Sequence, residues 1–289
     1  MPQVSVLITS YNREKFIAEA IESILASTYQ DFELIIVDDA STDNTVPIAR
    51  SYTERDKRIK IVVNDSNLGD YPNRNKAASF ATGKYIKYVD SDDRISPEGL
   101  QLMVEAMENY PEAAFAFSDV NANKHEHYPV LYSGEAALRK HFFSGGLLLA
   151  GPASTIIRLK AFKNIFGFSG KRYVSDYEAW LNLCLSYSAI VLKPGLMWIR
   201  KHYEQENEVG KLEYYHLNYN LHKAFIKNAS NPFSNKERAI LLYNYKILLG
   251  RRVYQRLLKW YGIKKTWDVV EKCGENWFIF IAAFLPVKR

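Results

Sequence analysis

The sequence predicts an α/β fold in which helices flank a mainly parallel central sheet, followed by a C-terminal helical extension. Two observations predict the sheet: strand and helix patterns alternate along the first 120 residues, and the connections between them are short. A third observation predicts the extension, because the apolar spacing beyond Lys211 is helical to the end of the chain. At 289 residues and 47% hydrophobic content, the chain is long enough for one large domain with an extension.

Each expected element follows from a local pattern. Short runs rich in β-branched and aromatic residues predict strands at Val4–Thr9, Phe32–Val37, Ile59–Val63, Tyr85–Val89 and Ala113–Ser118. Segments with helical apolar spacing predict helices at Glu14–Ala26, Thr42–Arg55, Tyr71–Ala81 and Ser96–Asn109. Similar patterns predict helices at Ser133–Phe143, Ala161–Phe166 and Ser175–Tyr187, and strands at Ala189–Leu192 and Met197–Arg200. Asn231-Pro232 and Gly262 are expected to interrupt the helical extension.

Three carboxylates, Asp90, Asp92 and Asp93, follow directly on the strand expected at Tyr85–Val89. Close like charges repel, so something must stabilise them, and a divalent cation is the simplest partner because hard cations take oxygen ligands. A cation at the carboxyl end of a parallel strand lies where such sheets bind ligands, and it can neutralise a diphosphate leaving group. The alternative is a turn before a helix capped by Ser96, with the acids favouring its N-terminus.

Four motifs occur in one order, at Val4–Asn12, Ile35–Asp43, Asn67–Asn75 and Val89–Asp93. This series resembles the family 2 glycosyltransferases with the GT-A fold, closely over the first 120 residues and more loosely to about His202. The resemblance implies a glycosyltransferase domain at residues 1–205, with the helical extension at 206–289. It also implies inverting, metal-dependent transfer of a sugar from a nucleotide donor.

The resemblance implies a nucleotide site made by Thr9, Tyr11, Asp39, Arg74 and Asp90. Thr9 and Tyr11 would line the base pocket, although a strand end and a turn are the alternative. Asp39 would accept the imide N–H of uracil, which favours a UDP-sugar, while capping of the next helix is the alternative for Asp38-Asp39. Arg74 would meet the phosphates. However, Asp70 and Pro72 depart from the family's pattern, and an ordinary surface arginine is the alternative.

The same resemblance implies the metal ligands and the base. Asp92 would bind Mn²⁺ or Mg²⁺, Asp90 would hold the ribose or the metal's water shell, and His202 would be a third ligand or a diphosphate contact. Asp176 would be the catalytic base that takes the acceptor's proton. The alternative for Asp176 is a helix start in which Ser175 and Glu178 form a capping box. Ser169 and Ser175 stand where the family usually has acids.

Charge is distributed unevenly along the chain. The formal net charge is +6, yet residues 236–289 contain 12 Lys and Arg against 4 Asp and Glu, which leaves 26 against 28 in residues 1–235. A basic, apolar tail favours an anionic membrane surface over a nucleic acid. Trp277–Leu285, nine apolar residues, is too short for a span of about 20. Packing on the catalytic domain or a homodimer contact is the alternative.

The two cysteines, Cys184 and Cys273, form no disulfide framework, and no secretory leader pattern is present. We therefore expect a cytoplasmic protein, peripheral on the inner face of the plasma membrane if the tail binds lipid. The expected acceptor is a glycan or a lipid-linked glycan, as in the synthesis of bacterial surface polysaccharide. The alternative function is an inert nucleotide-sugar or glycan binding module on the same fold.

Overall fold

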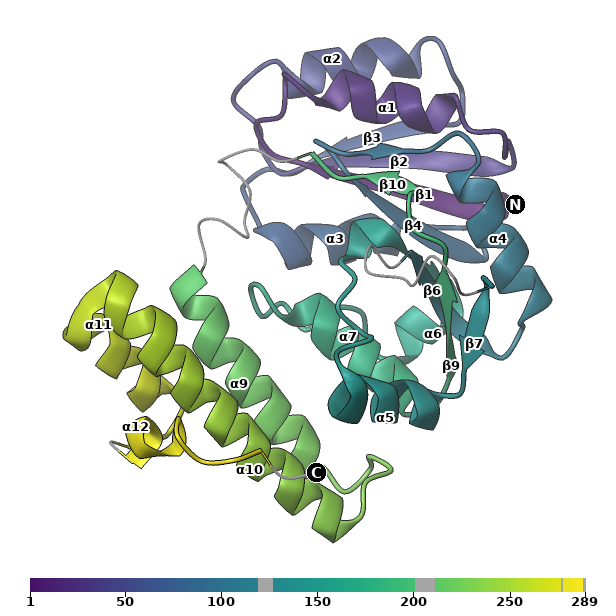
Figure 1. Ribbon diagram of the computed structural model, residues 1–289. Helices are drawn as coiled ribbons and strands as arrows, with labels where there is room; N and C mark the ends of the chain where they lie inside the picture. The colour runs from purple at the N-terminus through teal and green to yellow at the C-terminus, as the bar shows by residue number, and fades with distance from the viewer. Residues whose placement is uncertain (119–126, 201–210, 277, 288–289) are drawn as a thin grey trace. The chain divides into compact units, whose positions relative to one another are not determined.

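The computed structural model describes residues 1–118, 127–200, 211–276 and 278–287 (Figure 1). The chain divides into two compact units, Met1–Lys201 and His202–Arg289. Each unit is described by itself.

The first unit is built on an eight-stranded sheet with the order β3-β2-β1-β4-β8-β6-β9-β7. Its strands are β1 Val4–Ser10, β2 Phe32–Asp38, β3 Ile59–Val63, β4 Tyr85–Asp90, β6 Ala113–Ser118, β7 Val130–Tyr132, β8 Thr155–Arg158 and β9 Ser188–Leu192. Strands β1 to β4 run parallel, and so do β6 and β9. Strand β8 lies antiparallel between β4 and β6, and β7 lies antiparallel to β9. A separate ladder pairs β5 Arg94–Ile95 with β10 Met197–Trp198.

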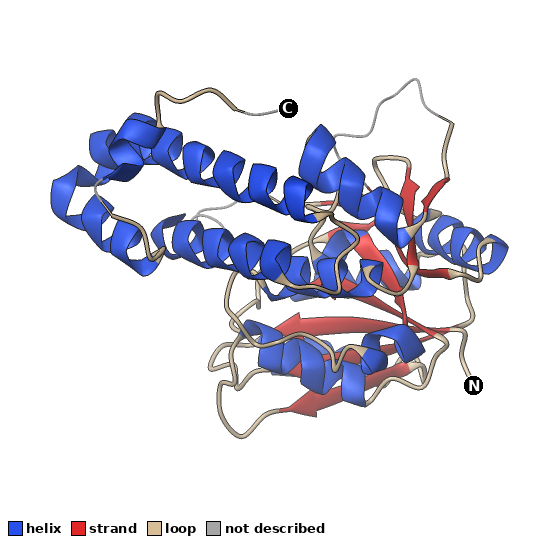
Figure 2. Ribbon diagram, turned by 90° about the horizontal axis from the view of Figure 1, so that it is seen from below, coloured by secondary structure: helices blue, strands red, loops and turns tan. Residues whose placement is uncertain are grey.

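Helices lie on both faces of this sheet (Figures 1 and 2). They are α1 Ile17–Leu25, α2 Thr45–Thr53, α3 Asp70–Ser79, α4 Gly99–Asn109, α5 Gly134–Ser144, α6 Leu159–Asn164 and α7 Ser175–Cys184, with a 3₁₀ turn at Pro152–Ser154. Helices α1, α2 and α4 share one apolar core with the even-numbered residues of β1. An aromatic group, in which Trp180 of α7 stacks on Phe115 of β6 at 5.2 Å, lies outside that core. The predicted α/β class is therefore confirmed, as is the alternation of elements over the first 120 residues.

Three short strands were not anticipated: β5, β7 and β8. Each has two to four residues, too few for a periodic pattern, and each is stabilised by pairing with strands distant in the chain. The expectation that Ser96 caps a helix was wrong, because α4 begins at Gly99. Ser96 donates its backbone N–H to the Leu196 carbonyl at 3.0 Å and accepts the Gly99 backbone N–H at 2.8 Å, so a turn at Pro97-Glu98 precedes the helix.

The second unit consists of helices α9 Lys211–Lys227, α10 Asn235–Arg252, α11 Leu258–Lys272 and α12 Phe278–Ala282, with a π-helical turn at Val253–Leu257. Its core joins α9, α10, α11 and α12 through residues such as Tyr219, Val270 and Ile279. Gly250 lets α12 approach α10, because a Cβ there would lie 2.5 Å from the Ile279 carbonyl oxygen. The expected break at Gly262 is confirmed by its φ of 73°. Among the described residues, none of the helices is both long and apolar enough to cross a membrane.

Candidate active site

The carboxyl ends of β1, β2 and β4 bring the predicted nucleotide residues to one edge of the sheet. In the strand register, Thr9 lies opposite Asp90, and Ser10 lies opposite Asp38. Asp39 follows β2 immediately, and its backbone N–H donates to the Ser10 carbonyl at 2.8 Å. Tyr11, just beyond β1, is 45% exposed, so its ring is accessible for stacking. The parallel pairing therefore gathers residues as distant in sequence as Thr9 and Asp90, which are 81 positions apart.

The two acids at the end of β2, Asp38 and Asp39, have different partners. Asp38 accepts the Ser10 and Ser41 hydroxyls at 2.8 and 2.6 Å, together with the Ser41 backbone N–H at 2.8 Å. Asp38 thus holds the turn after β2. Ala40 in that turn has a φ of 64°, a left-handed conformation that is uncommon for alanine.

Asp39 instead holds the loop between β3 and α3. Its carboxylate accepts the Asn64 side-chain N–H at 2.7 Å and the backbone N–H groups of Leu68 and Gly69 at 2.8 and 2.9 Å. The two backbone contacts belong to the Asn67-Leu68-Gly69 motif and link it to the end of β2. The helix after this turn is held by Asp43, which accepts the Thr45 backbone N–H and hydroxyl, so Asp39 does not cap it.

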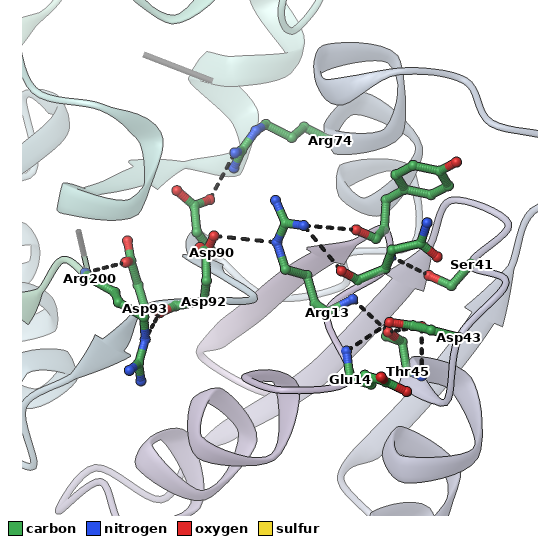
Figure 3. A network of polar contacts seen from close by, with 12 residues as sticks. Arg13, Glu14, Ser41, Asp43, Thr45, Arg74, Asp90, Asp92, Asp93 and Arg200 are labelled. Atoms are coloured by element: carbon green, nitrogen blue, oxygen red, sulfur yellow. Dashed lines mark hydrogen bonds and ion pairs between the residues drawn. The ribbon is translucent and has the colours of Figure 1, made fainter. Parts of the chain in front are cut away.

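Arg74 is not an ordinary surface arginine, because it is only 8% exposed. Its Nε donates to Asp70 at 2.7 Å, and its Nη2 donates to Asp90 at 2.8 Å (Figure 3). Its Nη1 is buried without a hydrogen-bond partner among the described residues. A buried guanidinium N–H without an acceptor is costly, and a phosphate oxygen would satisfy it. Asp70, whose presence departs from the family pattern, is thus part of the device that orients Arg74.

Asp92 and Asp93 are also held by arginines (Figure 3). The Arg13 Nε lies 3.3 Å from an Asp92 carboxylate oxygen. Asp93 accepts the Arg200 backbone N–H at 2.9 Å, and the Arg200 Nε donates to the Asp92 carbonyl at 3.1 Å. Sequence reasoning missed Arg13, which lies next to the Tyr11-Asn12 motif but 79 positions from Asp92. His202 lies outside the described residues.

The donor set at this edge fits a divalent cation bound together with a diphosphate. Within residues 1–118, 127–200, 211–276 and 278–287, no group of three or more His, Cys, Asp and Glu side chains is arranged as a complete metal site. Magnesium, however, is commonly held by one or two carboxylates plus substrate phosphates and water. The Asp90 and Asp92 side chains are 31% and 13% exposed and bear oxygen donors, and the guanidinium that carries the buried Arg74 Nη1 is bound to Asp90.

A buried lysine, Lys87, lies in the strand that leads to this acidic segment, and the sequence patterns did not identify it. Lys87 is in the middle of β4 with no exposed surface, and its ammonium donates to the backbone carbonyls of Tyr88 and Ala153. Burial lowers its pKa to about 7, while Asp90 and Asp93 act in the opposite direction. Lys87 therefore ties the strand that carries the acids to the 3₁₀ turn at Pro152–Ser154.

Asp176 lies in the first turn of α7 and is half-buried. Burial raises the pKa of its carboxyl to about 6, although hydrogen bonds from the Tyr177 backbone and the Tyr71 hydroxyl, and the charge of Arg74, act in the opposite direction. Arg74 thus acts on both Asp90 and Asp176. A carboxylate with a pKa near 6 can accept a proton at neutral pH.

The capping box at Ser175 and Glu178, which was the alternative to a catalytic role for Asp176, is absent from α7, whose first residue is preceded by Val174 with no side-chain cap. Ser175 instead donates to the Lys171 carbonyl at 2.7 Å, and Glu178 pairs with the Lys171 ammonium at 2.7 Å. Ser169, from the preceding Gly-Phe loop, also hydrogen-bonds Ser175 and Glu178. Ser169 and Ser175, which stand where the family usually has acids, therefore stabilise the loop that precedes Asp176 by hydrogen bonds.

Comparisons with known proteins show which family this chain belongs to. A family model described as glycosyl transferase family 2 matches residues 5–166. An uncharacterized glycosyltransferase of Methanocaldococcus jannaschii is 35% identical over 188 residues, which cover 62% of this chain and 64% of that protein. A Bacillus subtilis protein named "Putative teichuronic acid biosynthesis glycosyltransferase TuaG" is 39% identical over 117 residues, 40% of this chain and 45% of that protein. The matches thus span less than two thirds of these relatives.

A solved structure shows the same fold. TarS of S. aureus, residues 1–349 in complex with UDP-GlcNAc, superposes with a TM-score of 0.69 over 94% of this chain and 81% of that chain, at 21% identity.

Proposed function

Because the chain belongs to glycosyl transferase family 2, we propose that it transfers a sugar from a nucleotide donor to a glycan acceptor, with inversion at the anomeric carbon. The observation that carries this proposal is the convergence of Asp39, Asp90 and Asp92 at one sheet edge, together with an arginine that has an unsatisfied buried N–H. The catalytic domain would be residues 1–205, and residues 206–289 would be the extension.

The proposed donor is a UDP-sugar. Asp39 is held in place by its loop contacts, and a carboxylate suits the imide N–H of uracil. Thr9 and Tyr11 would form the wall of the base pocket, and Asp90 would hold the ribose. The similar fold of TarS, solved with UDP-GlcNAc, supports this choice of donor.

Asp92 and Asp90 would hold Mn²⁺ or Mg²⁺, with His202 proposed as a further ligand. When bound, the cation neutralises the developing charge of the leaving diphosphate. The Arg74 guanidinium would bind a phosphate oxygen through Nη1. Asp176 would take the proton from the acceptor hydroxyl, on the opposite side of the sugar from the leaving group.

The proposed acceptor is a growing or lipid-linked glycan of a bacterial surface polysaccharide. The similarity to TuaG, whose name refers to teichuronic acid biosynthesis, supports this class of acceptor. The match spans less than half of that relative.

Donor binding and donor hydrolysis test this function. UDP, GDP and their sugars would be titrated calorimetrically with and without Mn²⁺, and sugar release to water would be followed for the donor that binds. Asp92→Asn should lose the Mn²⁺-dependent part of UDP binding. Asp56→Asn, which removes a carboxylate from an ion pair with Arg58 just before β3, is the matched control. Binding without any turnover would favour the inert binding module instead.

We further propose that the C-terminal extension contacts an anionic membrane surface, which would make the protein peripheral on the inner face of the plasma membrane. Large apolar side chains are exposed on α12 and just beyond it, at Phe278, Ile281, Phe284, Leu285 and Val287. The excess of 12 basic over 4 acidic residues in 236–289 favours an anionic partner.

Flotation with vesicles tests this surface. Full-length protein should float with vesicles that contain phosphatidylglycerol and not with pure phosphatidylcholine. The double variant Phe278→Ser/Phe284→Ser should lose flotation, while Phe166→Ser, which removes a 93% exposed phenylalanine from the first unit, should retain it. A concentration-dependent dimer that the double variant abolishes, without lipid binding, would assign the surface to a homodimer.

A further inference from the structure

Arg13 connects the loop after β1 to the acidic segment after β4. Its Nη1 donates to the backbone carbonyls of Tyr11 and Asn12 at 3.2 and 3.1 Å, and its Nε lies 3.3 Å from Asp92 (Figure 3). Its backbone N–H donates to the Thr45 hydroxyl at 2.7 Å, which fixes the base of the side chain. The guanidinium thus stands between the proposed base pocket and the proposed metal ligand.

Two of the carboxylates at this edge have arginine partners. Asp90 is paired with Arg74, and Asp92 is paired with Arg13. A divalent cation added to this arrangement would lie beside two guanidinium groups, which is unfavourable unless an arginine turns away or an anion arrives with the cation. The positive charges of Arg13 and Arg74 therefore oppose the binding of a metal ion at this site.

The two arginines differ in their freedom to move. Arg74 is buried and is held by Asp70 as well as by Asp90. The Arg13 side chain is 24% exposed, against 10% for Arg74, and its other side-chain contacts are to two backbone carbonyls at its own loop. The Arg13 guanidinium can therefore move away from its carboxylate more easily than the buried Arg74 guanidinium can.

We propose that Arg13 is an exchangeable counter-ion: the divalent cation takes the Asp92 carboxylate, and the released guanidinium binds the donor's diphosphate. This inference rests on the proposed metal-dependent transfer. The cation and the nucleotide would each raise the protein's affinity for the other, because the diphosphate replaces the Asp92 carboxylate as the anion beside Arg13. The competing view is that Arg13 is a fixed strut that only holds the Tyr11-Asn12 loop.

The test measures binding to the full-length protein and requires no turnover. Free Mn²⁺ would be titrated by electron paramagnetic resonance with and without UDP, and UDP by calorimetry in saturating Mn²⁺. The wild type would be compared with Arg13→Gln, Arg13→Lys and the control Arg139→Gln, which removes an exposed ion pair with Glu135 on α5. Thermal unfolding would verify that each variant is folded.

Arg13→Gln should bind Mn²⁺ about fivefold more tightly in the absence of UDP, because a competing counter-ion is gone. It should bind UDP about tenfold more weakly in the presence of Mn²⁺, because a charged hydrogen-bond donor is gone. Arg13→Lys should keep Mn²⁺ affinity near the wild-type value, and Arg139→Gln should change neither. A fixed strut would not change the affinities for Mn²⁺ and UDP in opposite directions.

Weaker binding of both ligands by Arg13→Gln, or wild-type binding of both, would overturn the exchange. If Arg13→Gln does not fold, a wild-type Mn²⁺ affinity that does not rise on addition of UDP would overturn it as well. Wild-type protein that binds neither Mn²⁺ nor UDP would instead refute the proposed function, so the two failures are distinguishable.

Discussion

The Arg74 guanidinium donates to the Asp90 carboxylate at 2.8 Å and so joins helix α3 to the end of strand β4. The same guanidinium is bound to Asp70 and acts on the pKa of Asp176 on α7. One buried charge is therefore shared by the proposed donor site and the proposed base.

Removing that charge should affect both stability and binding. Arg74→Gln leaves the Asp70 and Asp90 carboxylates without their partner, and we expect the free energy of unfolding to fall by about 2–3 kcal/mol. UDP binding should be lost, because Nη1 can no longer bind a phosphate. Urea unfolding and calorimetry check the two effects. An Arg74→Gln variant as stable as Arg139→Gln, whose exposed pair is worth about 0.5 kcal/mol or less, would contradict the shared role.

The neighbouring acids Asp38 and Asp39 should respond differently to the same change. Asp38→Asn weakens contacts with Ser10 and Ser41 that hold the turn, so it should lower stability by about 1–2 kcal/mol. Asp39→Asn should also reduce UDP affinity, by about tenfold in a protein that remains folded, because the charged acceptor for the uracil imide is gone. Calorimetry on the two variants provides the comparison. Equal UDP affinities of the two variants would show that Asp39 does not bind the base.

The transfer rate should depend on the protonation of Asp176. Since its pKa is raised to about 6, kcat/KM should rise with pH through about 6 and level off above it. Asp176→Asn should lower kcat by at least about 100-fold and abolish this pH dependence. A pH profile of transfer, with circular dichroism to confirm folding, makes the measurement. Near-normal transfer by folded Asp176→Asn would show that another group is the base.

Asp176→Asn should make the protein more stable at neutral pH. The carboxyl has a higher pKa in the folded state than the value of 3.8 expected when unfolded, so ionisation between about pH 4 and pH 6 costs stability. The variant avoids this cost, and we expect a gain of about 1 kcal/mol at pH 7.5, kept small because the side chain is half-buried, and almost none at pH 4. Urea unfolding at both pH values measures it. A loss of stability at pH 7.5 would mean that the carboxylate supports the fold.

Glu33 should make the first unit sensitive to acid. Burial opposes its ionisation, but hydrogen bonds from Thr82, Lys60 and Ser5 lower its pKa to about 2. Its contribution is therefore complete above about pH 4.5 and is lost as the pH falls toward 2. Glu33→Gln should cost about 2 kcal/mol at pH 7 and less at pH 3. If the stability difference between variant and wild type is the same at pH 7 and pH 3, the lowered pKa is not the cause.

Local patterns predicted the parts of the fold whose signal lies within one segment. The strand at Ile59–Val63 and the strand at Ala113–Ser118 have the expected bounds, because each is a short, mainly apolar segment. Strand β8 could not be predicted in this way. Its four residues form a strand because β4 and β6 are available on either side, and that availability depends on the packing of the whole sheet.

By itself, the sequence determined the class of fold, the family and the positions of the acids that follow β2 and β4. This is so because a strand pattern specifies where the chain reaches the edge of a parallel sheet. Only the tertiary structure decided which charges meet there. Arg13 with Asp92, Arg74 with Asp90 and Lys87 with the Ala153 carbonyl are contacts between separate elements. Such contacts are set by how helices and loops pack on the sheet, and no local spacing encodes them.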